Sequence, residues 1–202
     1  MLALVRETYN VMQQQKMLVA LPQRAALDQL LGRKNEITSI FKRIYSKKLN
    51  VTKTRIHGTL SLAQVLLTGK DVAIHDFGGL PSRSYGEARL KRSPFWDVAF
   101  MMRSYYYAGY EGFLGTVHVN KEEINALLPY ADLWVKYMSG FFLTAYLQVV
   151  KDSDFIPKSK DELNLMLQNY LLEKALYALK YELANRPDKT IIPLAMIRNI
   201  LD

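Results

Sequence analysis

The chain has 202 residues, 50% of them hydrophobic, with a formal net charge of +8 and no cysteine. This length supports one substantial hydrophobic core, and the lack of cysteine excludes disulfides, a thiol nucleophile and a cysteine zinc site. The positive charge would suit nucleic acid, but no nucleic-acid-binding motif accompanies it, so we interpret the basic residues as solvated faces and expect no nucleic-acid partner.

The sequence does not predict a membrane protein. Its apolar runs are shorter than the roughly 20 residues of a membrane-spanning helix. The first twenty residues include Arg6, Glu7 and a run of glutamines, where a secretory signal would have an apolar block. We therefore expect a soluble, cytoplasmic protein with no membrane partner.

Helical patterns dominate the first fifty residues. Residues 2–20 predict a first helix, and Pro22 at a first helical position opens a second helix through Tyr45, with apolar side chains at helical spacing. The sequence pattern then changes to short apolar runs around Gly58 and a turn at residues 68–71. This change predicts one small β-hairpin within residues 54–76, the only sheet that we expect.

Three further long helices and a short one are predicted after the hairpin. Ser93 and Pro94 are typical of an N-cap and first helical residue, which begin a helix through about Tyr110. Two pairs of a capping residue and an acid three positions later predict helices near 121–150 and 160–185. Residues 192–201 complete a mainly α fold with one hairpin.

Three motifs fall in a fixed order along the chain. They read IHGTLSLAQVL at residues 56–66, DFGGLPSRS at 76–84 and KRSPFWDVAFMMRSY at 91–105, and LLEKALYAL at 171–179 and YELANRP at 181–187 follow. This series resembles the C-terminal lobe of maltokinases, free or fused to trehalose synthase, in the aminoglycoside-phosphotransferase-like kinase family. That family writes roughly IHGDLHLGQVL, DFEGEPARP, KRSPLRDVAGMLRSF, LLEKAIYEL and YELNNRP.

The resemblance implies a kinase-like C-terminal lobe spanning residues 1–202, with a helical lead-in at 1–50, a hairpin with catalytic-loop and metal-loop remnants at 51–80, and a helical subdomain at 81–202. It places the catalytic carboxylate at Thr59, whose hydroxyl is too weakly basic to replace it. It also places metal ligands at Gln64 and Asp76. The family's loop acids fall at Gly78 and Leu80, and its loop histidine falls at Ser61.

A nucleotide site is also poorly supported by the sequence. The lead-in shows neither a glycine-rich loop after a strand nor the strand lysine that holds nucleotide phosphates. One carboxylate and one amide make a weak Mg²⁺ site, because this ion prefers several hard oxygen ligands. We therefore expect no cofactor, with ATP and Mg²⁺ needed only if the chain is an active kinase.

Several candidate residues have a structural interpretation beside the functional one. The resemblance implies that Asp97 holds the backbone of the catalytic loop. An acid in the first turn of a helix is also favourable simply because it interacts with the helix dipole. Asp76 is either a remnant ligand or a turn residue, and His57 most simply bonds to local backbone. Large aromatic side chains replace smaller family residues near the former active cleft. The candidate cleft comprises His57, Ser61, Gly78, Leu80, Phe95, Trp96 and Phe100.

Three functions remain open from the sequence. The first is a catalytically inactive, pseudokinase-like lobe that serves as a binding or scaffold module for an apolar small molecule or a protein partner. The second is an engineered or designed lobe with a reshaped apolar cleft. The third is an active phosphotransferase that makes maltose 1-phosphate from maltose and ATP in trehalose or glycogen metabolism. The oligomeric state is not predicted.

Overall fold

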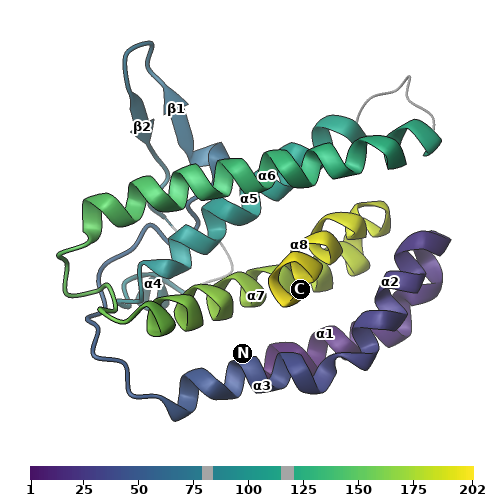
Figure 1. Cartoon of the computed structure of the whole chain (residues 1–202), viewed down its shortest axis with the longest axis horizontal. Coiled ribbons are helices and arrows are strands. Elements are labelled where there is room, and N and C mark those ends of the chain that lie inside the picture. Colours follow the sequence, from purple (N-terminus) through teal and green to yellow (C-terminus); the bar gives the residue numbers. More distant parts are fainter. Residues whose placement is uncertain (79–83, 115–120) are drawn as a thin grey trace. The chain divides into compact units, whose positions relative to one another are not determined.

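The computed structural model describes residues 1–78, 84–114 and 121–202, and it is mostly helical with one small antiparallel sheet (Figure 1). The chain forms two compact units. Unit 1 comprises Met1–Leu49 and Asn164–Asp202, and unit 2 comprises Asn50–Leu163. The expectation that the chain works as a single kinase-like lobe stays a prediction.

Unit 1 is entirely helical. It contains α1 (Leu2–Gln15), η1 (Lys16–Leu18), α2 (Leu21–Gly32), α3 (Lys34–Ser46), most of α7 (Lys160–Asn185), η3 (Pro187–Thr190) and α8 (Ile191–Leu201). The prediction of one helix from Pro22 to Tyr45 was wrong, because the chain breaks at Arg33, where ψ is 12°. Gly32 precedes the break, and glycine is a weak helix former.

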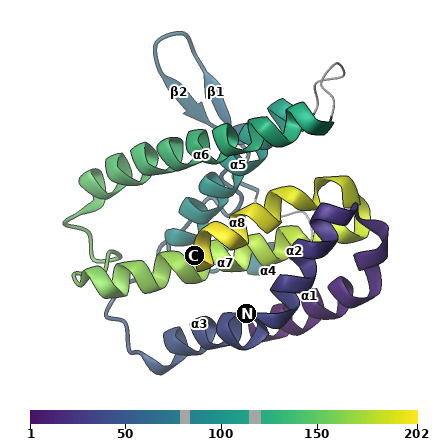
Figure 2. The same ribbon diagram turned by 45° about the vertical axis from the view of Figure 1, so that its right-hand side comes forward.

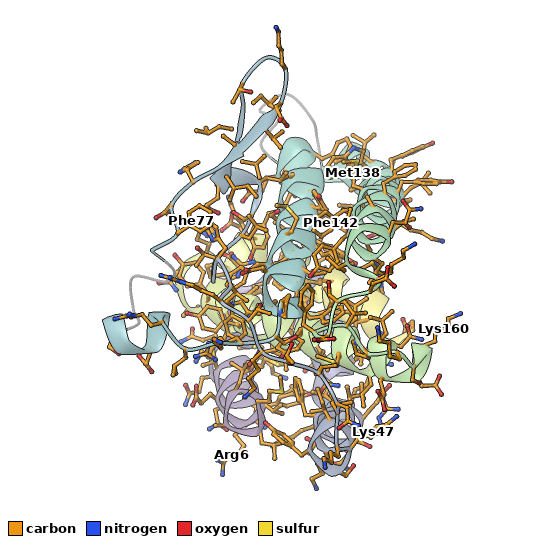
Figure 3. All side chains as sticks on the ribbon, turned by 90° about the vertical axis from the view of Figure 1, so that its left-hand side faces the viewer. Arg6, Lys47, Phe77, Met138, Phe142 and Lys160 are labelled. Atoms are coloured by element: carbon orange, nitrogen blue, oxygen red, sulfur yellow. The ribbon has the colours of Figure 1, made fainter. Side chains whose placement is uncertain are left out.

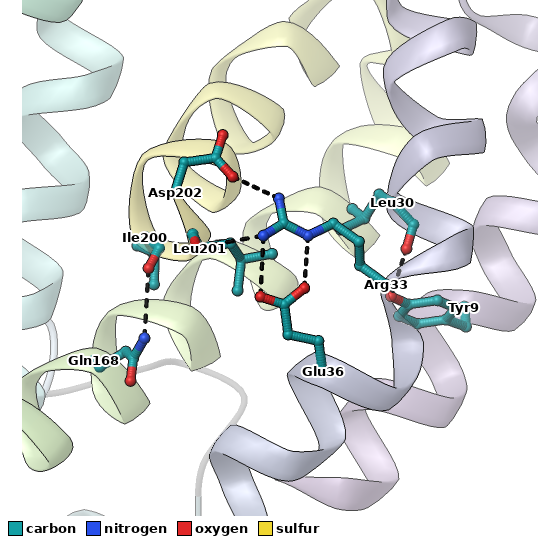
Figure 4. A network of polar contacts seen from close by, with 8 residues as sticks. All are labelled: Tyr9, Leu30, Arg33, Glu36, Gln168, Ile200, Leu201 and Asp202. Carbon is teal, nitrogen blue, oxygen red and sulfur yellow. Dashed lines mark hydrogen bonds and ion pairs between the residues drawn. The ribbon is translucent and has the colours of Figure 1, made fainter.

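Polar contacts join the helices of unit 1 around this break (Figure 4). Arg33 Nε donates to Glu36 Oε2 at 2.7 Å, and its Nη1 donates to Asp202 Oδ1 at 2.7 Å. Tyr9 OH donates to Leu30 O at 2.8 Å, which ties α1 to α2. The ion pairs are partly exposed and contribute about 0–1 kcal/mol each, so the buried apolar side chains supply most of the stability. Those fully buried include Met12, Leu27, Ile37, Phe41, Leu172, Leu176, Leu179, Leu183, Ile192 and Met196.

Unit 2 contains the expected hairpin, in a shorter form. Strands β1 (Val65–Leu67) and β2 (Val72–Ile74) pair with Val65 opposite Ile74 and Leu67 opposite Val72. Thr68 N donates to Asp71 O at 2.9 Å, and Gly69 supplies the positive φ of 87° that the turn needs. Residues before β1 form the short helix η2 (Leu62–Gln64) instead of extending the strand. In Figures 1 and 2 the hairpin extends away from α5 and α6.

Besides η2 and the first turn of α7, unit 2 contains the helices α4 (Tyr85–Ala88), α5 (Phe95–Leu114) and α6 (Lys121–Val150), of which the short α4 was not predicted. Ser93 Oγ accepts a hydrogen bond from Phe95 N at 3.3 Å, as an N-cap does. Helices α5 and α6 pack side by side (Figure 2). The Tyr105 ring contacts Phe142 edge-on at 5.9 Å between centroids, and Phe142 is labelled in Figure 3. Across the described ranges, no helix is both long enough and apolar enough to cross a bilayer.

Gly109 sets how closely α5 approaches α6. A Cβ at this position would lie 3.0 Å from Val135 Cγ2 and 3.1 Å from Trp134 Cε3. We expect Gly109→Ala to lower the free energy of unfolding by about 1–3 kcal/mol, because the two helices must separate. Gly112→Ala is the matched control, since no heavy atom lies within 4 Å of a Cβ there. It should raise stability by up to about 1 kcal/mol in urea denaturation, and equal effects of the two changes would contradict this account.

Candidate functional site

The candidate site is built on a buried carboxylate at the start of α5. Asp97 Oδ2 accepts a hydrogen bond from His57 N at 2.7 Å, and Oδ1 accepts one from Gly58 N at 2.8 Å. Burial raises the pKa of Asp97, and the backbone N–H groups of Gly58 and His57, which favour the ionised form, offset part of this rise. Asp97 therefore fixes the loop that carries Thr59, and this is more than a helix-dipole contact.

The His57 ring joins this loop to the end of the hairpin. Its Nε2 lies 2.8 Å from His75 O, so the ring proton sits on Nε2. Nδ1 then accepts, and both the backbone N and Oγ1 of Thr59 lie 3.4 Å from it. His57 is buried and the Phe77 ring, labelled in Figure 3, contacts it at 4.7 Å between centroids. His57 thus has a structural role in shaping the loop.

Thr59 occupies the position at which the resemblance places the catalytic carboxylate. It follows Gly58, whose φ of 96° turns the chain sharply. The Thr59 side chain is half-buried, and its hydroxyl faces His57 Nδ1. Near neutral pH this hydroxyl keeps its own proton and is a very weak base, so it cannot accept a proton from a substrate as a carboxylate would.

Gln64 uses its side chain within its own loop. Its Oε1 accepts hydrogen bonds from Ser61 Oγ at 2.6 Å and from Ser61 N at 3.2 Å, which makes a capping box around η2. A second contact holds the start of this helix, because Leu62 N donates to Ser104 Oγ at 3.1 Å. To coordinate a cation, Gln64 Oε1 would have to give up at least one of its two hydrogen bonds from Ser61.

Asp76 has an unusual backbone conformation. Its φ of 64° is positive, which is uncommon for a residue other than glycine, and it lies two residues after the end of β2. Such a conformation costs energy for most residues and is enriched at functional sites, although aspartate tolerates it in turns. A Cβ at Gly78 would lie 3.5 Å from Asp76 Oδ1, which is an ordinary van der Waals contact, so position 78 lies beside this carboxylate. Leu80 lies outside the described residues.

The three aromatic residues of the candidate cleft are buried. Phe95 is 0%, Trp96 8% and Phe100 6% exposed. Trp96 Nε1 donates to Gly58 O at 2.9 Å, and the Arg92 guanidinium lies 5.2 Å from the Trp96 ring centroid. These side chains therefore support the loop from inside, and little of their surface is open to a ligand. Phe77, whose ring contacts His57 of the loop, is by contrast 69% exposed.

No protein-family model matches the chain. Its fold is similar to that of solved glucosamine kinases. The complex of a glucosamine kinase with glucosamine, ADP and inorganic phosphate matches 99% of this chain with a TM-score of 0.73 and 17% identity. Glucosamine kinase in crystal form B matches 99% of the chain with a TM-score of 0.72, also at 17% identity.

The fold is kinase-like. The chain spans less than half of the glucosamine kinases that it matches, covering 44% of the complex and 46% of crystal form B. At this level of identity the likeness shows the fold alone. The elements of the fold agree with the mainly helical chain and one small hairpin expected from the sequence.

Sequence reasoning missed several residues around the site. Tyr146 of α6 lies near Asp97, and burial together with that carboxylate raises the pKa of Tyr146 to about 12. Ser104 holds η2, and the backbone of Arg92 pairs with Thr54 in an isolated bridge. The motif that contains Arg92 and Ser104 was recognised, but their partners depend on tertiary packing that spacing does not specify.

Proposed function

We propose that this chain is a catalytically inactive, maltokinase-like C-terminal lobe that serves as a binding or scaffold module. One observation carries the proposal: Asp97 holds the loop of His57 and Gly58 through two short hydrogen bonds, while Thr59 stands where a kinase of this type needs a carboxylate. The framework that positions a catalytic group is present, and the group itself is replaced.

The metal-binding residues support the same proposal. Asp76 offers one carboxylate, and the Gln64 amide oxygen already accepts two hydrogen bonds from Ser61. Phosphoryl transfer needs Mg²⁺ held firmly against the phosphates, so this set favours binding without catalysis.

The partner surface that we propose is the exposed apolar part of the hairpin region. It comprises Ile74 and Phe77, which are 46% and 69% exposed. An apolar small molecule or a protein partner would bury this surface, and each large side chain contributes about 1.5–3 kcal/mol when fully buried. The buried Phe95, Trp96 and Phe100 do not form this surface.

A thermal-shift and dye-binding experiment tests the proposal. We expect about 5 mM Mg²⁺–ATP to leave the melting temperature unchanged, and the apolar dye anilinonaphthalene sulfonate to bind saturably. Phe77→Ala should weaken dye binding at least threefold, because Phe77 packs on His57 at the loop. Leu66→Ala is the matched control and should change little, because Leu66 is 53% exposed but lies on the opposite face of the hairpin from Ile74.

The second candidate function is ATP-dependent phosphorylation of maltose. The positive φ of Asp76 favours it, since backbone strain is often retained at a working site. A melting temperature that rises with Mg²⁺–ATP concentration, and no longer does so in Asp76→Asn, would replace the binding-module proposal with this one.

A further inference from the structure

Helix α6 exposes a stripe of aromatic side chains. Tyr130, Trp134, Tyr137 and Phe141 are 65%, 41%, 59% and 71% exposed. Leu133 beside them is 49% exposed. At 3.6 residues per turn these five positions fall within an arc of about 100° on one side of the helix. We call these five residues the α6 stripe.

The α6 stripe is poor in charge. Between residues 126 and 150 the charged residues are Asp132 and Lys136. Asp132 accepts a hydrogen bond from Tyr110 OH at 2.6 Å and is half-buried, so Lys136 is the exposed charge. A sugar platform needs polar groups beside its rings to bind hydroxyls, and such groups are scarce here. The composition instead suits the core of a protein interface, which is rich in aromatic residues and poor in charge.

Three of the four rings of the stripe already contact other rings within the single chain. Trp134 packs edge-on against Tyr105 of α5 at 6.3 Å between centroids, and against the surface that Gly109 leaves open. Tyr137 stacks with Phe141 at 6.4 Å. Rigid aromatic side chains lose little conformational entropy on binding, which favours association.

The spacing of the four aromatic residues is symmetric. Trp134 follows Tyr130 by four residues, Tyr137 follows Trp134 by three, and Phe141 follows Tyr137 by four. The spacing is therefore the same in both directions along the helix. In an antiparallel pair with a two-fold axis between positions 134 and 137, Tyr130 faces Phe141 of the second copy and Trp134 faces Tyr137 of the second copy. A two-fold interface requires this kind of self-complementary patch. The same four-three-four spacing also forms the seam of packed helix pairs.

We propose that the α6 stripe is a homodimer interface, in which α6 packs antiparallel against α6 of a second copy of this chain. The available area is sufficient. An aromatic side chain can bury roughly 150–250 Å² of accessible surface. The four aromatic side chains are on average more than half exposed, so together they can still bury about 400–500 Å². Leu133 and the flanking side chains raise the surface that one copy can bury to about 600 Å². Two faces then bury about 1,200 Å², the lower limit for a specific interface. The dimer is therefore reversible and depends on concentration.

Sedimentation velocity of the full chain tests the proposal. We expect a monomer–dimer equilibrium between about 1 and 200 µM, measured at about 0.3 M salt so that repulsion between chains of net charge +8 is screened. Phe141→Lys and Tyr137→Lys should each weaken dimerisation at least tenfold. Both side chains are exposed, so circular dichroism and the melting temperature of the monomer should not change.

Val149→Lys is the matched control. Val149 is 85% exposed on the same helix, but it lies about 120° around the helix from Tyr137 and therefore outside the stripe. It adds the same charge and should leave the dimer intact. A monomer at every concentration would overturn the proposal, as would a dimer that Phe141→Lys and Val149→Lys weaken equally.

The orientation has a separate test, because the chain contains no cysteine. When Tyr130→Cys and Phe141→Cys proteins are mixed and oxidised, the antiparallel arrangement predicts mainly disulfides between the two different variants. Disulfides mainly between identical variants would show a parallel pair and overturn the arrangement. This inference does not depend on the proposed function, since neither readout involves the loop at Thr59.

Discussion

Asp97→Ala is expected to lower the free energy of unfolding by about 2–4 kcal/mol. The two carboxylate oxygens accept from His57 N at 2.7 Å and Gly58 N at 2.8 Å, and Asp97 is only 8% exposed. Alanine would leave two buried N–H groups without partners, at about 1–3 kcal/mol each. Urea denaturation followed by circular dichroism measures the change, and the midpoint should fall at an unchanged slope.

Two variants separate this loop contact from a helix-dipole effect. Asp97→Asn should also destabilise, because an amide has one acceptor oxygen and its NH₂ would face one of the two N–H groups. Asp161→Ala removes an exposed acid from the first turn of α7 and should cost no more than about 1 kcal/mol. If Asp97→Ala lowers the free energy of unfolding no more than Asp161→Ala does, then Asp97 acts only through the helix dipole and the loop contact contributes nothing measurable.

Much of the fold could be predicted because its signals are local. The turn at residues 68–71 needs a positive φ, and Gly69 provides it, so the hairpin was placed correctly although its strands are shorter. The helices predicted near 121–150 and 160–185 were confirmed as α6 (Lys121–Val150) and α7 (Lys160–Asn185). The break at Arg33 was missed because apolar side chains continue at helical spacing across it.

The candidate site was less predictable, because burial is a property of the packed chain. Phe95, Trp96 and Phe100 were named as candidates for the cleft, because they replace polar or smaller residues of the maltokinase pattern. Trp96 instead points inward and donates to Gly58 O. The exposed α6 stripe was missed for the opposite reason. Helix α6 is apolar on more than one side, and periodicity does not say which side another element covers.

A second large effect is expected in catalysis, where this chain should transfer no phosphate. A positioned general base supplies about 10²–10⁴-fold in rate, and Thr59 cannot act as one. The proposed metal site has Asp76 as its one carboxylate, while Gln64 is bonded to Ser61. Losing the base and weakening the metal site together should place any transfer below detection.

The most direct test of the central claim is therefore a phosphoryl-transfer assay with labelled ATP, Mg²⁺ and either maltose or glucosamine. The purified chain is compared with Asp76→Asn and with a protein-free blank. The account predicts no sugar phosphate above the blank for either protein, and any signal common to both is a contaminating kinase. Sugar phosphate that the unmodified chain forms after repurification, and that Asp76→Asn does not form, would contradict the account.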